Sequence, residues 1–249
     1  MADLDLVEQS HKIIRSGDER RITLRLLGGL AVRLSSPSST SHERLRRSYA
    51  DIDLVGLSRD KWKIKELFID LHYLPDERFN ALHGRTRLIF YPPDGERHID
   101  IFLDRFQMCH SLDLRQRLFP GYLTLSMADL LLTKLQVVQM NAKDMQDILA
   151  IMMDHPVGTA ESLEMIDIRY LGKLASMHWG LYTTLSDNLH RTMEETEDFL
   201  NGEERLTIKT RIEVMIKTLE ETPKSATWQM RSKIGRRVEW YELPDEVNR

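Results

Sequence analysis

The 249-residue sequence lacks the features that define several protein classes. Cys109 is its single cysteine, which excludes a disulfide framework and a zinc site built from thiolates. No apolar run approaches the roughly 18 residues that a membrane-spanning helix needs. The start of the chain has no basic segment followed by an apolar one, so we expect no secretory signal, no membrane partner and a cytoplasmic protein.

The chain also lacks an excess of charge of one sign. Its 35 Lys and Arg residues oppose 39 Asp and Glu residues, for a net charge of −4. This balance argues against a protein that coats nucleic acid over its whole surface, but it allows local basic patches. A hydrophobic share of 41% and a charged share of 30% are typical of a globular protein and exclude a mainly disordered one. The one compositionally biased segment, the Ser-rich 35–41, predicts a mobile loop.

Glycine and proline positions divide the chain into two parts of different character. Up to about residue 118, short β-like runs alternate with helical stretches. The patterns predict strands at 24–27 and 51–57, a helix at 61–72, and a hairpin of 85–91 and 97–103 joined by Pro92-Pro93-Asp94-Gly95. After Phe119-Pro120-Gly121 the spacing is helical, over 126–140, 141–154, 160–200 and 203–221. We therefore expect an α/β (α+β) core with a small mixed sheet at 1–120, followed by a mostly helical domain at 121–249.

Acidic residues occur at defined positions on the predicted strands. Asp51 and Asp53 would share one side of a strand, while Ile52 and Leu54 point into the core. Two carboxylates held together repel each other unless a cation lies between them, and oxygen ligands favour Mg²⁺ or Mn²⁺. Asp100 lies between two isoleucines on the second hairpin strand, so its face is either solvated or meets a cation. Acidic pairs with the same spacing also occur at Asp3/Asp5 and Glu195/Glu197, so the spacing alone does not indicate a metal site.

Two consecutive glycines, Gly28 and Gly29, follow the first predicted strand and open a short helix. Glycines at such a point let backbone N–H groups approach a phosphate closely, at the helix end that favours negative charge. A Gly-Gly pair alone is more often a simple turn.

Together, the glycines, the Asp-x-Asp strand and the later Asp resemble the nucleotidyltransferase superfamily related to DNA polymerase β. The resemblance implies that Gly28 and Gly29 cradle a nucleoside triphosphate. It also implies that Asp51 and Asp53 bind two Mg²⁺ ions, with Mn²⁺ as an alternative, and that Asp100 binds the catalytic ion and helps to activate the attacking hydroxyl. The 21 residues between Gly29 and Asp51 exceed the family's usual spacing, and we interpret the excess as a loop insertion within 35–47.

A lysine lies within an apolar helical stripe in the second part of the chain. Ser126 and Asp129 have the capping-box spacing that starts a helix, and Lys134 falls among its apolar positions, opposite a polar side that includes Asp129. Such a lysine either extends its ammonium to water or meets an anion such as a nucleotide phosphate. On the next predicted helix, Asp144 lies at the edge of the apolar face, whereas Asp147 is expected nearer solvent.

These two helices sharpen the resemblance. The run from Leu123 to Leu135 and the later Lys143-Asp144-Met145-Gln146-Asp147-Ile148 look like the minimal nucleotidyltransferases of the AbiEii and MenA toxin type. The segment Arg47-Ser48-Tyr49-Ala50-Asp51-Ile52-Asp53 resembles the Arg-x-Ser/Thr-x-Asp-x-Asp segment of that group. The resemblance covers about 20–155. It implies that Lys134 and Asp144 belong to the active site and that Arg47, Ser48 and Lys134 bind nucleotide. Antibiotic-modifying nucleotidyltransferases share much of this pattern.

The expected function is Mg²⁺-dependent transfer of a nucleoside monophosphate from an NTP to a hydroxyl, with release of pyrophosphate. The toxin resemblance favours an RNA acceptor, the 3′ end of tRNA, and an antitoxin protein as a partner in a toxin–antitoxin or abortive-infection system. One alternative is an antibiotic or other small-molecule acceptor, and a second is a nucleotide-binding module without turnover. Basic patches at Arg44, Arg46 and Arg47 and near Arg231 and Arg236 are either solvated or contact an RNA backbone.

Overall fold

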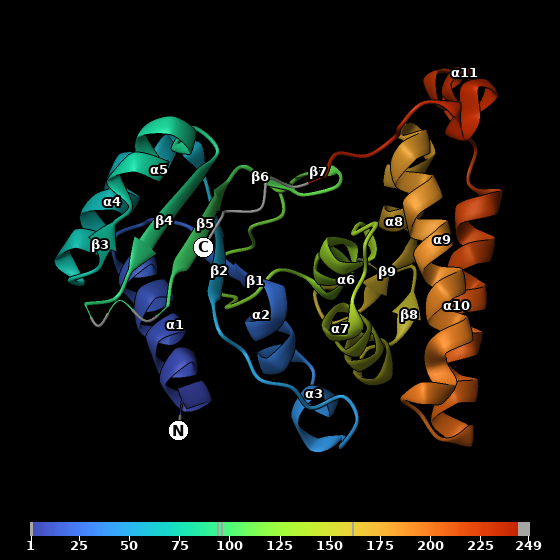
Figure 1. Ribbon diagram of the computed structural model, residues 1–249, viewed down its shortest axis with the longest axis horizontal. Helices are drawn as coiled ribbons and strands as arrows, with labels where there is room; N and C mark the ends of the chain where they lie inside the picture. The colour runs from blue at the N-terminus through green and yellow to red at the C-terminus, as the bar shows by residue number, and fades with distance from the viewer. Residues whose placement is uncertain (1, 94, 96, 161, 244–249) are drawn as a thin grey trace. The chain divides into compact units, whose positions relative to one another are not determined.

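The computed structural model describes residues 2–93, 95, 97–160 and 162–243, and it divides into two compact units (Figure 1). The first comprises the residues up to Ser35, Ser48–Phe106 and Ser111–Leu125, and the second comprises Ser36–Arg47, Gln107–His110 and the residues from Ser126 onward. The predicted division after residue 120 differs from this one because 36–47 and 107–110 pack with the second unit. The first unit also extends to Leu125, since the Leu125 N–H donates to the Leu26 carbonyl at 3.0 Å.

The first unit is built on a five-stranded mixed sheet in the order β1-β2-β5-β4-β3. The strands are β1 (Leu24–Leu27), β2 (Ile52–Gly56), β3 (Leu74–Pro75), β4 (Arg87–Tyr91) and β5 (Ile99–Leu103). β2 and β5 run parallel, and the other neighbouring strands are antiparallel. The predicted hairpin of β4 and β5 is confirmed, although Asp94 of its turn lies outside the described residues.

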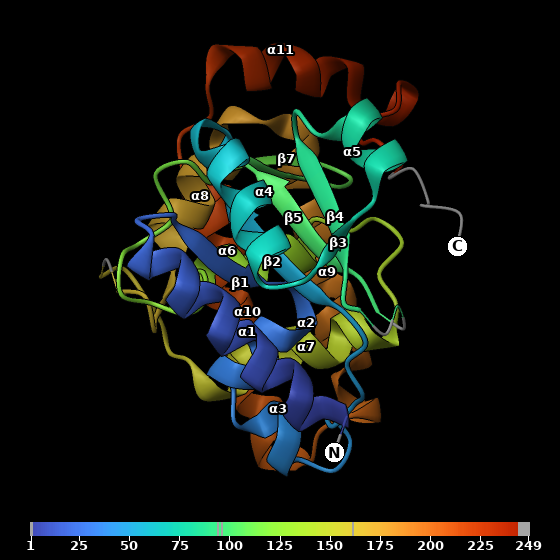
Figure 2. The same cartoon turned by 90° about the vertical axis from the view of Figure 1, so that its left-hand side faces the viewer.

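Helices α1 and α4 lie side by side over one face of this sheet (Figure 2). The remaining elements of the unit are α1 (Ala2–Glu19), α2 (Gly28–Ser35), the 3₁₀ helix η1 (Ser58–Asp60), α4 (Lys61–Asp70), α5 (Glu77–His83), β6 (Arg105–Gln107) and β7 (Ser111–Asp113). The α4 side chain Ile64 lies 3.0 Å from where a Cβ on Gly56 would be, so α4 covers the face of β2 that carries Gly56. Ile52 and Leu54 share that face and are buried, as predicted.

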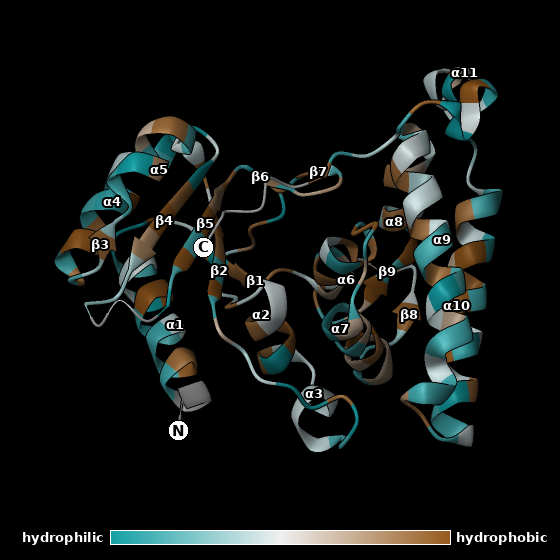
Figure 3. Cartoon of the chain, viewed as in Figure 1, coloured by the Kyte–Doolittle hydropathy of each residue, from teal (hydrophilic) through white to brown (hydrophobic). Residues whose placement is uncertain are grey.

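The second unit is mostly helical. It contains α3 (Ser38–Ser41), α6 (Met127–Leu135), α7 (Ala142–Asp154), α8 (Ile168–Met177), α9 (Trp179–Glu195), η2 (Thr196–Asp198), α10 (Gly202–Glu221), α11 (Ala226–Ile234), η3 (Gly235–Arg237) and a parallel pair of two-residue strands, β8 (Val157–Gly158) and β9 (Ile166–Asp167). Strands β4 and β5 are largely hydrophobic, whereas hydrophilic residues cover much of α10 (Figure 3). The expected fold class, a core with a small mixed sheet followed by a mostly helical domain, is confirmed.

Two predicted helices are shorter or more divided than expected. The predicted helix 126–140 ends at Leu135. The predicted helix 160–200 is interrupted because Asp167 caps α8, accepting from the Arg169 and Tyr170 N–H groups, and because His178 adopts extended backbone between α8 and α9. Local hydrogen bonds and backbone conformation determine where these helices begin and end. The spacing of apolar residues does not indicate these positions.

The expected mobile loop at 35–41 is wrong. Ser35 ends α2, and Ser38–Ser41 form α3. The Asp154 carboxylate at the end of α7 accepts from the Ser38 N–H at 2.8 Å and from the Ser38 hydroxyl at 2.5 Å. A carboxylate that accepts two such bonds orders a serine-rich segment that composition alone describes as flexible.

Candidate functional site

Two of the predicted site carboxylates stand opposite each other in the sheet. Asp53 of β2 is paired in register with Asp100 of β5, on adjacent parallel strands. Neighbouring strands are about 4.8 Å apart, so both side chains leave the same face at close range. Asp51 lies two residues before Asp53, immediately ahead of β2, and extended backbone there would put its side chain on that face too. This is the face opposite the one that carries Ile52 and Leu54.

Gly28 lies against this acidic face at the junction of β1 and α2. Its φ of +70° falls in the left-handed region, which side chains disfavour. A Cβ at Gly28 would lie on the Asp53 carboxylate, only 2.9 Å from its Cγ. The first turn of α2, which includes Gly29, therefore begins directly beside an acid of the predicted metal site.

Arg87 of β4 neutralises Asp100. Its Nε lies 2.7 Å from Oδ1 and 2.9 Å from Oδ2 of Asp100, and its Nη2 donates to Oδ2 as well. Burial by itself would lower the pKa of Arg87, but the hydrogen bonds and charge of Asp100, with a contribution from Asp53, raise it above its ordinary value. The Asp100 side chain is only 3% exposed, so its charge is compensated inside the protein by a guanidinium that is always protonated.

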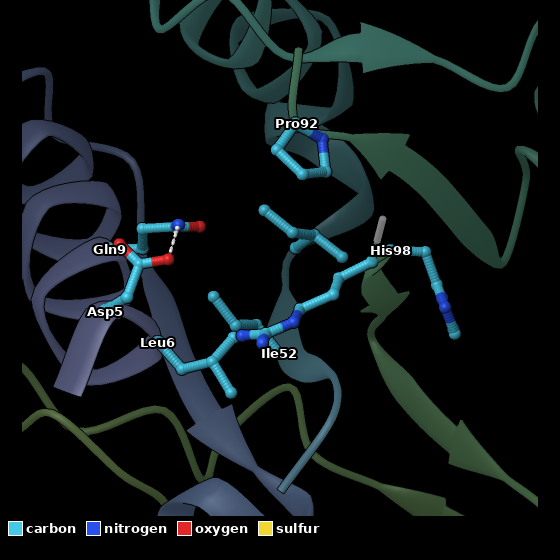
Figure 4. Close-up of a pocket in the computed structure, with 8 residues that line it drawn as sticks. Asp5, Leu6, Gln9, Ile52, Pro92 and His98 are labelled. Carbon is cyan, nitrogen blue, oxygen red and sulfur yellow. Dashed lines mark hydrogen bonds between the residues drawn. The ribbon is translucent and has the colours of Figure 1, made fainter. Parts of the chain in front are cut away.

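The third acid, Asp51, pairs with a histidine beside a small pocket. The His98 Nδ1 lies 3.3 Å from the Asp51 Oδ1. The pocket, shown in Figure 4, is lined by Asp5, Leu6 and Gln9 of α1, Ile52, Ile99, Pro92, Arg97 and His98. Within it, Gln9 donates to the Asp5 carboxylate at 2.9 Å. Polar groups of the pocket thus extend from α1 to the residue that pairs with Asp51.

The acids of this face fit a divalent cation by their chemistry. They supply only carboxylate oxygens, the donors that Mg²⁺ and Mn²⁺ prefer. At Asp100 a cationic side chain already stands in for such an ion. In the part of the chain that the structure describes, no group of three or more His, Cys, Asp or Glu side chains is arranged as a metal cluster. Both oxygens of Asp100 are turned to Arg87 in this arrangement.

The second unit contains three more of the predicted residues, Lys134 of α6, Asp144 of α7 and Arg47, in a buried ion network. The Lys134 Nζ lies 2.9 Å from Asp147 and 3.2 Å from Asp144. Arg47 donates two hydrogen bonds to Asp147, from Nε to Oδ1 at 2.9 Å and from Nη2 to Oδ2 at 2.7 Å. Burial lowers the pKa of Lys134, but Asp147 and Asp144 more than offset it and raise the pKa above its ordinary value. Lys134 therefore stays an ammonium at neutral pH and does not reach bulk water freely, since its side chain is 14% exposed.

The expected solvent position of Asp147 is wrong, because the side chain is 1% exposed and binds both cations. The polar residues on the other side of the preceding helix, Asp129, Thr133 and Gln136, are buried as well. Helix α6 is enclosed on every side, which a two-sided helical pattern does not reveal. Asp144 also has a second task, since it completes a capping box with Asn141 at the start of α7.

Sequence reasoning missed Asp147 and Arg87. The signal for Arg87 was present: alternation along the predicted hairpin puts it on the same face as Asp100, with opposite charge. The signal for Asp147 was its spacing of three residues from Asp144, which places both on one helix surface. Ser48, by contrast, is exposed and belongs to the first unit, one residue beyond Arg47 of the second.

Basic residues near the end of the described chain are partly used inside the second unit. The Arg231 guanidinium lies 4.5 Å from the ring centre of Trp179 and donates to the Gly235 carbonyl at 2.7 Å. Arg236 pairs with Asp187 and stacks over Trp240 at 5.1 Å. These two side chains hold α11 and the segment after it in place, which accounts for part of the basic patch without an RNA backbone.

No protein-family model matches the sequence, and a search of curated proteins finds no match. Among the described residues, each helix is too short or too polar to span a bilayer.

Solved structures give distant similarities. The antibiotic-resistance factor ANT(2'')-Ia has a TM-score of 0.42 and 13% identity, over 79% of this chain and 97% of that one. The lincosamide antibiotic adenylyltransferase LnuA, bound to lincomycin, has a TM-score of 0.40 and 15% identity, over 55% and 90%. A protein from H. pylori assigned as a nucleotidyltransferase has a TM-score of 0.43 and 11% identity, over 90% and 99%.

Proposed function

We propose that this chain is a nucleotidyltransferase that transfers a nucleoside monophosphate from an NTP to a hydroxyl acceptor and releases pyrophosphate. The observation that carries the proposal is the register of Asp53 with Asp100, together with the contact of Gly28 with the Asp53 carboxylate. These features bring the acidic face of the sheet next to the beginning of helix α2.

The acidic face is the proposed metal site, in which Asp51, Asp53 and Asp100 hold two Mg²⁺ or Mn²⁺ ions. A bound divalent ion lowers the pKa of an attacking hydroxyl and compensates the charge of the leaving pyrophosphate. The three acids supply the negative charge that selects a cation, and Asp100 is the proposed partner of the attacking hydroxyl.

The beginning of α2 is the proposed phosphate site, in which backbone N–H groups at Gly28 and Gly29 hold the triphosphate. A phosphate at this place would lie beside the Asp53 carboxylate, because a Cβ on Gly28 has no room there. Two anions at such close range are stable only with positive charge between them, so the phosphate site and the acidic face depend on the same cation.

Lys134 and Arg47 of the second unit are proposed nucleotide contacts, and so is Ser48, which follows Arg47 in the sequence and belongs to the first unit. This assignment rests on the family resemblance of their segments. Asp147 binds both cations and Asp144 binds Lys134, so the geometry supports a rigid cationic pair rather than two mobile surface residues.

RNA is the proposed acceptor, with the tRNA 3′ end favoured by the toxin resemblance, and an antitoxin protein is the proposed partner. Two of the similar structures bear the names of antibiotic-modifying proteins, so small molecules are the second acceptor class to test. If the protein is a toxin, its expression in a growing cell should arrest growth, and healthy growth with active enzyme would contradict that role.

The test supplies each of the four α-labelled NTPs with Mg²⁺ or Mn²⁺ to total RNA, an aminoglycoside and a lincosamide. We expect label on RNA, and at least about a 100-fold lower rate for Asp53→Asn and Asp100→Asn. Asp113→Asn is the matched control, because Asp113 is also a strand residue of the first unit paired with an arginine. Label on an antibiotic instead would move the acceptor to the small-molecule class. Full activity in Asp53→Asn protein, or no transfer from any NTP by the wild type, would refute the proposal.

A further inference from the structure

Arg87 and Asp100 form an ion pair with several hydrogen bonds on the acidic face. Arg87 Nε donates to both Asp100 oxygens, and Arg87 Nη2 donates to Oδ2. The guanidinium is therefore in contact with both oxygens of the Asp100 carboxylate. The Asp100 side chain is 3% exposed and Arg87 is 26% exposed, which leaves the cation nearer to solvent than its partner.

Aromatic rings hold Arg87 in this position. Its guanidinium carbon lies 4.9 Å from the ring centre of Phe102 on β5 and 5.7 Å from that of Phe79 on α5. Asp53 also attracts the guanidinium, so the same group responds to two of the three proposed metal ligands. Strand β5, through Asp100 and Phe102, and helix α5 thus both contribute to an arginine site that faces the acids.

The lone pairs that Asp100 gives to the Arg87 guanidinium are not available to a divalent ion, and a guanidinium and a metal ion on the same carboxylate repel each other. We propose that Arg87 is a built-in counter-cation that occupies Asp100 in the metal-free protein and competes with the divalent ion for it. This inference rests on the proposed function, because it takes Asp100 as a metal ligand. Arg87 thereby raises the concentration of divalent ion at which the acidic face becomes occupied.

The competition has a measurable size. When a binding-competent form is populated in only a tenth of the molecules, the apparent affinity of its ligand falls about tenfold. Removal of the arginine charge should therefore increase metal affinity, which is the opposite of what a merely structural partner would do. If Arg87 only fixed the Asp100 side chain, its loss would leave the ligand misplaced and would weaken metal binding.

The experiment measures Mn²⁺ binding to the full chain by electron paramagnetic resonance and by calorimetry, without nucleotide. We expect Arg87→Gln to bind Mn²⁺ at least about tenfold more tightly than the wild type. Arg87→Lys, which keeps the charge but not the bidentate fork, should lie between them. Arg115→Gln is the matched control, because Arg115 makes the same two-bonded pair with exposed Asp113 away from the acidic face, and its affinity should not change.

The gain in affinity should disappear when Arg87→Gln is combined with Asp100→Asn. Equal or weaker Mn²⁺ binding by Arg87→Gln, or a gain that persists without the Asp100 carboxylate, would overturn the inference. If Arg87→Gln is unfolded without metal, Mn²⁺ should restore its fold at concentrations that leave the melting temperature of the wild type unchanged, and failure to do so would count against it.

The outcome separates this inference from the proposed function. Tighter Mn²⁺ binding by Arg87→Gln together with no NMP transfer by the wild type would refute the proposed activity and leave the arginine's role standing. Transfer by the wild type with unchanged Mn²⁺ affinity in Arg87→Gln would do the reverse.

Discussion

Gly28 illustrates how one residue can serve the backbone and a site together. Its positive φ by itself favours glycine, and in addition the Asp53 carboxylate fills the space that a Cβ would occupy. Gly121 has a positive φ too, +81°, but nothing lies within 4 Å of its Cβ position. A side chain at Gly121 would meet backbone strain alone, whereas a side chain at Gly28 would meet both backbone strain and a steric clash.

We predict that Gly28→Ala lowers the free energy of unfolding by about 2–4 kcal/mol and abolishes NTP binding, because strain adds to a clash with the Asp53 carboxylate. Gly121→Ala should cost only about 1 kcal/mol and leave NTP binding intact. Urea unfolding and nucleotide titration measure the two effects. Equal costs for both variants would mean that the Asp53 contact is easily relaxed.

Asp147 and Asp144 share one lysine but have different surroundings. Asp147 is buried and binds both Lys134 and Arg47, whereas Asp144 is 13% exposed and also caps α7. Removing the charge of Asp147 takes away the acid that binds both Lys134 and Arg47, two poorly solvated cations. Removing that of Asp144 leaves Lys134 still paired.

We therefore predict that Asp147→Asn lowers the free energy of unfolding by about 2–4 kcal/mol. Asp144→Asn should cost about 1 kcal/mol, mainly through the weakened cap. Chemical denaturation of the two variants gives the comparison, and a larger cost for Asp144→Asn would contradict this account of the network.

At the scale of elements, α7 organises the second unit by holding the segment 36–47 at both ends. Asp154, at the last turn of α7, binds Ser38, and Asp147, two turns earlier, binds Arg47. The long spacing between Gly29 and Asp51 is thus taken up by an ordered segment with its own short helix. A loop insertion is cheap in chain entropy, but this one is fixed by two carboxylates.

Loss of one attachment should release this segment. We predict that Asp154→Ala increases the rate of tryptic cleavage at the exposed Arg44 and Arg46 at least about fivefold, because cleavage follows local opening. Glu194→Ala, which changes an exposed acid on α9, should leave that rate unchanged. Unaltered cleavage in Asp154→Ala would show that α3 is held by its other contacts.

At the scale of the whole molecule, a half-buried histidine joins segments that are far apart in the sequence. The His110 N–H donates to Gln136 at 2.6 Å, and its Nε2 lies 2.8 Å from the Thr184 hydroxyl, to which Trp240 also donates. Burial, and to a lesser extent the charge of His178, lower the pKa of His110 to about 4. The folded protein thus keeps this ring neutral under conditions in which an unfolded chain would protonate it.

The sign of the pH effect follows from this difference. Between pH 6.5 and about 4 the unfolded state binds more protons at His110, so the free energy of unfolding should fall as the pH falls through that window. We predict a loss of about 1–2 kcal/mol from this group, after a discount for its partial exposure. The change should be missing in His110→Gln, measured at matched pH by tryptophan emission, which reports mainly on the second unit because Trp179, Trp228 and Trp240 lie there. Parallel pH curves for the two proteins would contradict it.

The sequence alone determined much of the first unit. Alternation placed Ile52 and Leu54 inside and the acids on the opposite face, and the Pro92-Gly95 turn predicted the hairpin that carries Asp100. These features are local, since strand period and turn chemistry act within a few residues. The start of α2 at Gly28 and the start of α6 after Ser126 were predictable for the same reason.

Only the tertiary structure decided which charges meet. Arg87 finds Asp100 because β4 and β5 pair in one register, and Arg47 finds Asp147 although 100 residues separate them. The burial of Asp147, and the order of the serine segment, likewise depend on neighbours from distant parts of the chain. The electrostatic free energy of an ion pair depends on distance and desolvation, and the fold sets both quantities, which no spacing along the chain encodes.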